Sequence, residues 1–382
     1  MGLPSRKPVH ARHRAGPGRA NDREQASRLR GERLLAGLIA LCFALPATAE
    51  TLRVATWDAG LSRRGPGLLL KDIRKGEAQV AAATRIVDTI APDVLLLTGI
   101  DWDLDGLSLE ALNERLAHPY PHLFAPRPNS GWPSGADLDG NGKLGEARDA
   151  QGYGRFPGQG GMALLSRYPF EADRVRDFSR MLWKDLPDGR IAGAKLSPEA
   201  MAVQRLSSTG HWDVPLKLPS GERLHLLAFS ATPPVFDGPE DRNGRRNRDE
   251  IAFWLRYLDG ELDALPPEAQ VILMGDANLD PKDGEGRRDA LDLLLNGPHF
   301  QDPQPRSAGA KAAADPDHRG DPSLDTADYD GPGNLRLDYV LPSNDLHVEA
   351  AGVVWPEPGA PLAEAARVAS RHKMVWLDIE LP

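Results

Sequence analysis

Short apolar runs bounded by glycine, proline and charged residues recur along this chain of 382 residues, and they predict strands. Val271–Met274 is one such run, and Gly275 follows it directly. A strand that is buried on both faces need not alternate apolar and polar positions, so we expect a core strand here. Further runs predict strands within residues 51–57, 92–97, 161–170, 223–234, 335–343, 353–358 and 374–381.

Apolar residues at helical spacing lie between these runs. They predict helices over residues 77–91 and 246–262. The succession of strand, helix and strand favours an α/β architecture. No internal repeat and no long linker divides residues 50–382, so we expect a single domain there.

The first 49 residues have a different pattern. An arginine-rich lead precedes the apolar run of Leu34–Glu50, which ends in Ala47-Thr48-Ala49, the order of a secretory signal peptide. The alternative, a membrane anchor, needs roughly 20 apolar residues. We expect a secreted or periplasmic protein that is cleaved after Ala49 and has no membrane span thereafter. The only cysteine, Cys42, would be removed, so the mature chain would fold without disulfides.

The charge balance is acidic. The whole chain has a formal net charge of −9, and from Glu50 onward it holds 37 Lys/Arg against 52 Asp/Glu, a net charge of −15. Proteins bind DNA and RNA largely through Lys and Arg that neutralise phosphates. The composition therefore disfavours nucleic acid as a partner, and it predicts nothing about oligomeric state.

Two polar residues follow the predicted strand at Val271–Met274. Asp276 and Asn278 are two positions apart, so in an extended chain their side chains point the same way, beyond the end of the sheet. They form either a site or a turn, because Asp, Asn and Gly all favour turns.

Six motifs in order decide between these alternatives. TLRVATWDAG, PDVLLLTGID, GMALLSRYPF, VILMGDANLDP, LRLDYVLPS and ASRHKMVWLDI together resemble the endonuclease/exonuclease/phosphatase superfamily over essentially all of the mature chain. The segments 149–170 and 232–247 resemble a secreted bacterial branch. The resemblance implies a four-layer sandwich of two face-packed mixed β-sheets flanked by helices. It also implies hydrolysis of a small phosphoester with Mg²⁺, Mn²⁺ or a similar cation.

The resemblance assigns roles to four residues. Asp276 and Asn278 match the pair that orients the attacking water and binds the phosphoryl group. His372 matches the terminal histidine, and Asp338 matches the carboxylate that orients it.

Four other family positions are changed. Asp58 replaces an asparagine, Gly99 the metal-binding glutamate, Ser230 a histidine, and Arg371 the aspartate before the terminal histidine. We expect Arg371 near Asp276, where it would bind phosphate and oppose a cation.

These changes leave two functions open. The first is an eroded site with weak or no catalysis, a pseudoenzyme that keeps the fold, and it is the one the sequence favours. The second is an active phosphodiesterase or phosphatase whose metal ligands are Asp58 with Asp101 or Asp103.

A second metal site is predicted between residues 135 and 150. Asp137, Asp139, Asn141 and the backbone carbonyl of Lys143 follow the first half of a calcium loop, with Gly142 at the turn. Arg148 stands where such loops have glutamate, so Glu146 or Asp149 would have to complete the site. A plain surface turn is the alternative.

Two further segments are open to two interpretations. The run 239–250 collects Arg242, Arg245, Arg246 and Arg248, which suit phosphate, but the interleaved acids favour a solvated cap. The Ala-, Gly- and Asp-rich residues 307–333 form either a lid or an insertion, and we favour an insertion.

Overall fold

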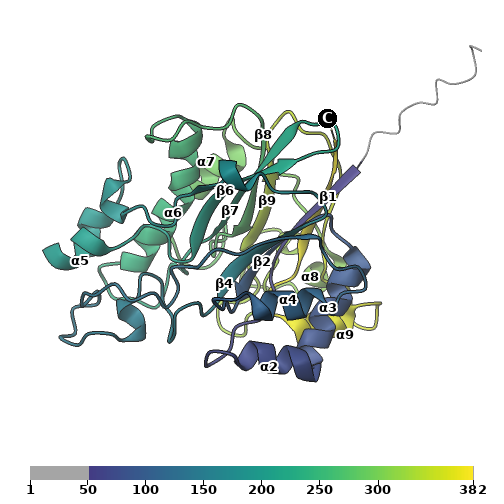
Figure 1. Ribbon diagram of the computed structural model, residues 1–382, viewed down its shortest axis with the longest axis horizontal. Coiled ribbons are helices and arrows are strands. Elements are labelled where there is room, and N and C mark those ends of the chain that lie inside the picture. Colours follow the sequence, from purple (N-terminus) through teal and green to yellow (C-terminus); the bar gives the residue numbers. More distant parts are fainter. Residues whose placement is uncertain (1–50, 382) are drawn as a thin grey trace, which may run out of the picture. The chain divides into compact units, whose positions relative to one another are not determined.

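Two mixed β-sheets pack face to face in the computed structural model, which describes residues 51–381 (Figure 1). The predicted signal peptide and its cleavage site lie outside the described residues. No helix among residues 51–381 is both long and apolar enough to cross a membrane.

The first sheet has six strands in the order β10-β11-β1-β2-β4-β3. β1 and β2 are parallel and the other neighbours are antiparallel. Its strands are β1 (Thr51–Asp58), β2 (Val94–Ile100), β3 (His122–Phe124), β4 (Gly161–Ser166), β10 (Val348–Val353) and β11 (Val375–Glu380).

The second sheet has five strands in the order β5-β6-β7-β8-β9. Only β7 and β8 are parallel. Its strands are β5 (Arg176–Asp177), β6 (Gly210–Lys217), β7 (Arg223–Ser230), β8 (Gln270–Asp276) and β9 (Asp338–Pro342).

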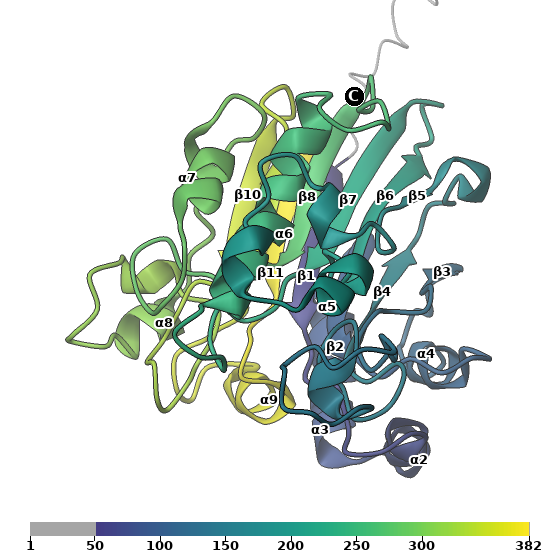
Figure 2. The same cartoon turned by 90° about the vertical axis from the view of Figure 1, so that its left-hand side faces the viewer.

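Helices cover the outer faces of both sheets. Against the first sheet pack α2 (Leu68–Lys75), α3 (Ala78–Ile90), α4 (Leu107–Asn113) and α9 (Ala363–Ala369). Against the second pack α6 (Arg242–Leu258) and α7 (Asp289–Asn296), and Figure 2 shows α6 lying across β6–β8. The short helices α5 (Pro198–Val203) and α8 (Ala308–Ala312) lie in connections. The predicted four-layer sandwich is thus confirmed.

The alternation of side chains along the strands explains both core and site. On β1, Leu52 and Val54 face the second sheet, and on β8, Ile272 and Met274 face the first. Successive side chains alternate between the faces, so Asp58 and Asp276, each the last residue of its strand, point into the same space between the sheets. On β9, Val340 faces this core and Asp338 shares its side.

The pattern predicted most elements but misplaced some. The run 353–358 is not a strand, because β10 ends at Val353. Helix α6 begins at Arg242, earlier than predicted, and the charged run is not a solvated cap. Arg246, Asn247, Asp249 and Glu250 are buried in it.

Candidate active site and metal centres

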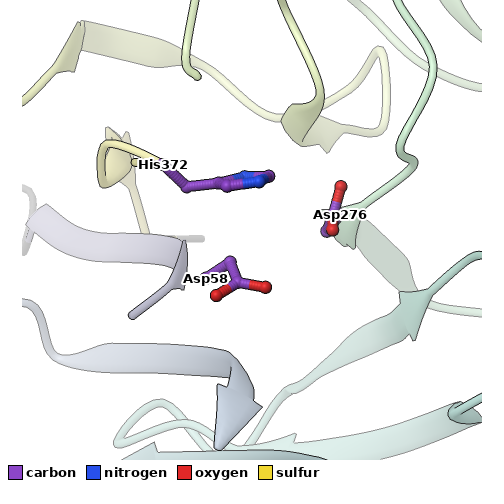
Figure 3. A group of neighbouring side chains, drawn as sticks. All are labelled: Asp58, Asp276 and His372. Atoms are coloured by element: carbon purple, nitrogen blue, oxygen red, sulfur yellow. The ribbon is translucent and has the colours of Figure 1, made fainter. Parts of the chain in front are cut away.

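Asp58, Asp276 and His372 form one cluster at the strand ends, here called the strand-end cluster. One ligand atom from each lies within 4.8 Å of the others. Figure 3 shows the imidazole and the two carboxylates converging from three segments of the chain. Asp276 and His372 are buried, whereas Asp58 is partly exposed. Two of the predicted catalytic residues and one predicted metal ligand therefore do meet.

Asn278 fixes the Asp276 carboxylate. Its backbone N–H donates to Asp276 Oδ1 at 2.8 Å, and its side-chain Nδ2 donates to Oδ2 at 2.6 Å. Nδ2 also donates to the carbonyl of Ala231, at 3.0 Å. Asn278 has a φ of 50°, in the left-handed region that asparagine tolerates better than most residues. This turn folds the amide back onto the carboxylate.

Both ring nitrogens of His372 have partners. Nδ1 lies 2.8 Å from Asp338 Oδ2, which also accepts a hydrogen bond from Thr326 Oγ1 at 2.8 Å. Nε2 lies 2.7 Å from the hydroxyl of Tyr329. The pair of Asp338 and His372 follows the resemblance.

Tyr329 and Thr326 were not predicted as site residues. Both lie in the segment 307–333, which is rich in Ala, Gly and Asp. No periodicity or spacing singles them out, and only the fold brings them to His372.

The charges of the strand-end cluster shift two pKa values. Burial raises the pKa of Asp276 well above its usual value, and the nearby Asp338 and Asp58 carboxylates add to this against the opposing charge of His372. Burial by itself would lower the pKa of His372, but Asp338, Asp276 and Asp58 raise it well above its usual value. The surrounding carboxylates thus favour the charged form of the His372 ring.

Asp58 occupies the space above Gly99. A Cβ atom added to Gly99 would lie only 2.3 Å from Asp58 Oδ1, and Gly99 has a φ of +62°, which favours glycine. The β2–β4 ladder shifts register between Thr98 and Ile100, so Gly99 sits in a β-bulge. A carboxylate from β1 thus fills the position from which the resemblance leads us to expect one on β2.

Arg371 is not where the sequence analysis placed it. Its Nη2 binds Asp330 Oδ2 at 2.8 Å and its Nη1 lies 3.4 Å from the carbonyl of Asp328; the side chain is 55% exposed. The expected position beside Asp276 is wrong, because Arg371 pairs with the acids that flank Tyr329. Its role as a phosphate ligand stays a prediction.

Asp101 and Asp103 do not join the strand-end cluster. Asp101 accepts hydrogen bonds from the backbone N–H groups of Arg63 and Gly160, at 2.8 and 3.0 Å. Asp103 accepts from the N–H groups of Leu107 and Ser108, both at 2.8 Å, at the first turn of α4. Both carboxylates hold backbone in place, so their predicted role as substitute ligands has no support in this geometry.

Ser230 stands where the resemblance expects a histidine. It ends β7 and pairs with Asp276 in the ladder. No hydrogen bond of its hydroxyl to another described residue is formed, and its carbonyl accepts one from Ser208 Oγ at 3.4 Å. A serine here is too short to reach as far as an imidazole would.

The predicted calcium loop brings Asp137, Asp139 and Asp149 together, here called the loop cluster; one ligand atom from each lies within 4.8 Å of the others. Asp149 is therefore the acid that joins the first two. Asn141 directs its Nδ2 to Asp139 and Glu146, at 3.1 and 2.7 Å, and its Oδ1 accepts from the N–H of Lys143.

The strand-end cluster has the donors that a small divalent cation requires. Mg²⁺ and Mn²⁺ take carboxylate oxygens and keep several waters, and Mn²⁺ also accepts imidazole. Asp58 and Asp276 supply carboxylates. The fully buried Asp338 has its Oδ1 without a hydrogen-bond partner among the described residues. Negative charge concentrated in this way fits a divalent cation.

Comparisons with known proteins agree with this architecture. A model of the Endonuclease/Exonuclease/phosphatase family matches residues 55–372. A search of curated proteins found no match. An endonuclease/exonuclease/phosphatase from Beutenbergia cavernae is 17% identical with a TM-score of 0.52, over 87% of this chain and 72% of that one. A family protein from Leptotrichia buccalis is 14% identical with a TM-score of 0.50, over 86% of this chain and 100% of that one. At such identities the structural likeness concerns the fold alone.

Proposed function

Because the chain belongs to the endonuclease/exonuclease/phosphatase family, we propose that it is an active phosphoester hydrolase whose divalent cation is held by Asp58 and Asp276. The observation that supports this is the Asp58 carboxylate above Gly99. The sequence favoured an eroded site. The geometry favours the alternative of a substitute ligand, and the substitute is Asp58 without Asp101 or Asp103.

Each residue of the site then has a chemical task. Asp276, oriented by Asn278, accepts the proton of the attacking water, whose oxygen forms a bond to phosphorus. The phosphorus–oxygen bond to the leaving group breaks, and the departing oxygen takes up a proton from solvent water. The positive charge of His372, held in place by Asp338, offsets the charge of a phosphoryl oxygen. A bound cation would neutralise the phosphoryl oxygens and lower the pKa of the water.

Moving the carboxylate from position 58 to position 99 tests the proposal. The assay is hydrolysis of bis(p-nitrophenyl) phosphate with Mn²⁺, together with Mn²⁺ affinity by calorimetry. We expect wild-type turnover that Asp58→Asn and His372→Ala each abolish. Gly99→Glu should also inactivate, because its side chain meets Asp58, whereas the double change Asp58→Asn with Gly99→Glu should restore part of the Mn²⁺ affinity and of the activity.

The opposite result is equally informative. If the wild-type protein binds Mn²⁺ but turns over no phosphodiester or phosphomonoester, the protein is a member that keeps the ligand site and has lost catalysis. If Asp58→Asn leaves Mn²⁺ affinity unchanged, Asp58 is not the substitute ligand.

The substrate and the compartment are part of the same proposal. A small phosphoester suits the acidic chain better than nucleic acid does. Export rests on the apolar run and Ala47-Thr48-Ala49. Mass spectrometry of protein from the periplasm or medium should find a chain that begins near Glu50, and a chain that still carries residues before Leu45 would rule this out.

A further inference from the structure

A pocket of about 420 Å³ opens beside the carboxyl end of β7, outside the strand-end cluster. Arg148, Arg242 and Arg246 line it, together with the rings of Tyr153 and Phe236. Among the described residues, no carboxylate lines this pocket, although acids outnumber bases in the chain as a whole. We call it the arginine pocket.

The three guanidinium groups keep free donors. Arg148 has no hydrogen bond or ion pair with another described residue, and only Nη1 of Arg242 has a partner, the carbonyl of Leu138 at 2.6 Å. Arg246 is 93% buried; backbone carbonyls occupy its Nε and Nη2, and its Nη1 has no partner among the described residues. Burial lowers the pKa of Arg246 to about 10, so it stays charged at neutral pH.

The buried acid whose charge acts on Arg246 is Glu250, and its oxygens are already occupied. Glu250 accepts hydrogen bonds from Ser208 with one oxygen and from the N–H of Thr232 with the other. The free guanidinium donors of the pocket are therefore available to an anion, and arginine forks suit phosphate oxygens.

Two aromatic rings stand at the same pocket. Tyr153 is 63% exposed and Phe236 is 77% exposed. Phe236 has a φ of 71°, a conformation that costs energy for a bulky residue and is found mostly at functional sites. Exposed ring faces stack on flat aromatic ligands.

The pocket adjoins the strand-end cluster through the backbone. Thr232, which lines the pocket, follows Ser230 by two residues, and Ser230 pairs with Asp276. Asn247 Nδ2 donates both to the carbonyl of Thr232 and to that of Ala277, at 2.7 and 2.8 Å. These hydrogen bonds tie the lining of the pocket to the end of β8 that carries Asp276.

We propose that the arginine pocket binds a phosphate group carried on an aromatic ring system, a second anionic part of the substrate remote from the bond that is cleaved. This rests on the proposed function, since it names the substrate class as small aromatic phosphodiesters with a further phosphate. The arginines bind the phosphate, and Tyr153 and Phe236 stack on the ring.

Calorimetry with phenyl phosphate in EDTA tests the pocket without any cation. The wild-type protein should bind phenyl phosphate more tightly than inorganic phosphate. Arg148→Met should weaken phenyl phosphate about tenfold, as expected for the loss of a charge-assisted hydrogen bond. Phe236→Ser should remove the preference for phenyl phosphate over inorganic phosphate.

A matched control is Arg85→Met on α3, an exposed arginine whose side chain has no partner among the described residues. It should leave the affinity unchanged. Equal effects of Arg148→Met and Arg85→Met, or no binding of phenyl phosphate to the wild-type protein, would overturn the proposal. Unchanged selectivity in Phe236→Ser would overturn the aromatic part.

Two further measurements separate the pocket from the catalysis. Asp58→Asn should leave phenyl phosphate binding in EDTA intact, so a protein without hydrolysis still tests the pocket. With Mn²⁺, Arg148→Met should raise the KM for an aryl phosphodiester that carries a second phosphate on its aromatic ring, and Arg85→Met should not. An unchanged KM would show that the pocket does not contribute to substrate binding.

Discussion

The strand-end cluster and the loop cluster contain similar acidic groups in opposite surroundings. Asp58, Asp276 and His372 come from distant parts of the chain and meet because strand ends place them together, whereas the loop cluster comes from the single segment Asp137–Asp149. Asp137 accepts hydrogen bonds from the backbone N–H groups of Gly140, Asn141 and Gly142. In the strand-end cluster, Asp276 has one backbone donor and is buried.

The two environments shift the pKa of a carboxylate in opposite directions. The backbone hydrogen bonds, that of Gly142 first, lower the pKa of Asp137, while burial raises that of Asp276. In the loop cluster, backbone N–H groups thus already stabilise the charged form of Asp137. In the strand-end cluster, carboxylates lie close together in a buried place, which is unfavourable, and a bound cation would reduce this penalty. The pKa of a carboxylate in these clusters therefore depends on its burial and its hydrogen bonds more than on the residue type.

The largest expected effect comes from Asp276→Asn, which separates function from stability. Hydrolysis should fall about 10³-fold, because the acceptor of the water's proton is lost. The melting temperature in EDTA at pH 8 should stay equal or rise, since the change removes a charge that burial penalises. A marked drop in melting temperature would show that this carboxylate stabilises the fold.

Tyr329→Phe should have a smaller effect on the same site. The hydroxyl on His372 Nε2 is lost while the ring remains, so we expect about a tenfold fall in kcat, the worth of one hydrogen bond to a charged group, with the melting temperature unchanged. Tyr120→Phe, which removes a hydroxyl that donates to the carbonyl of Pro92 on the outer side of the first sheet, is the matched control. An unchanged kcat would show that the Tyr329 hydroxyl does not contribute to catalysis and that the side chain only covers the site.

The loop cluster should respond to Ca²⁺ independently of the strand ends. Asp137→Ala with Asp139→Ala should abolish the rise in melting temperature that millimolar Ca²⁺ causes, at the affinity expected of an extracellular site. Asp58→Asn should retain that rise. If the double variant still responds to Ca²⁺, the segment is only a turn.

The smallest effect concerns Asp325, a buried acid next to Thr326. Burial, then Asp280, raises its pKa to about 7. Because the folded state binds this proton more tightly than the unfolded state, its contribution to stability is present near pH 4 and is lost as the pH rises through about 7. Asp325→Asn should match wild type near pH 4 and melt roughly 2 °C higher at pH 8, after allowance for solvent screening. A difference that does not change with pH would contradict this.

Local pattern was enough for the elements with regular apolar spacing. In α3, Val80, Ala83 and Val87 fall on the face that packs on the sheet, so the helix was predicted almost to its ends. β6 was missed because Asp213 and Pro215 interrupt its apolar pattern. The fold accepts Asp213 because His225 and Tyr257 bind it in the core, a contact that sequence spacing does not reveal.

The residues of the candidate site also fall into two groups, those that sequence motifs identify and those that only the fold reveals. Asp276 and Asn278 lie at the end of β8, Asp338 begins β9 and His372 lies just before β11, so all four stand in clear strand motifs that the sequence shows. Arg371 was misplaced because its partner Asp330 lies in a segment without a pattern. The pairing of Asp58 with Gly99 depends on a bulge and a left-handed residue, which only the backbone geometry shows.

The contact between Asp58 and the space above Gly99 also constrains how this protein can change over evolutionary time. A glutamate at position 99 alone would collide with Asp58, and an asparagine at position 58 alone would remove a carboxylate from the strand-end cluster. Each single step is expected to lose function while the paired step keeps it, which is reciprocal epistasis. Positions 58 and 99 are therefore expected to change together. A residue-by-residue comparison with the family pattern would count them as two independent losses, although they represent one displaced carboxylate.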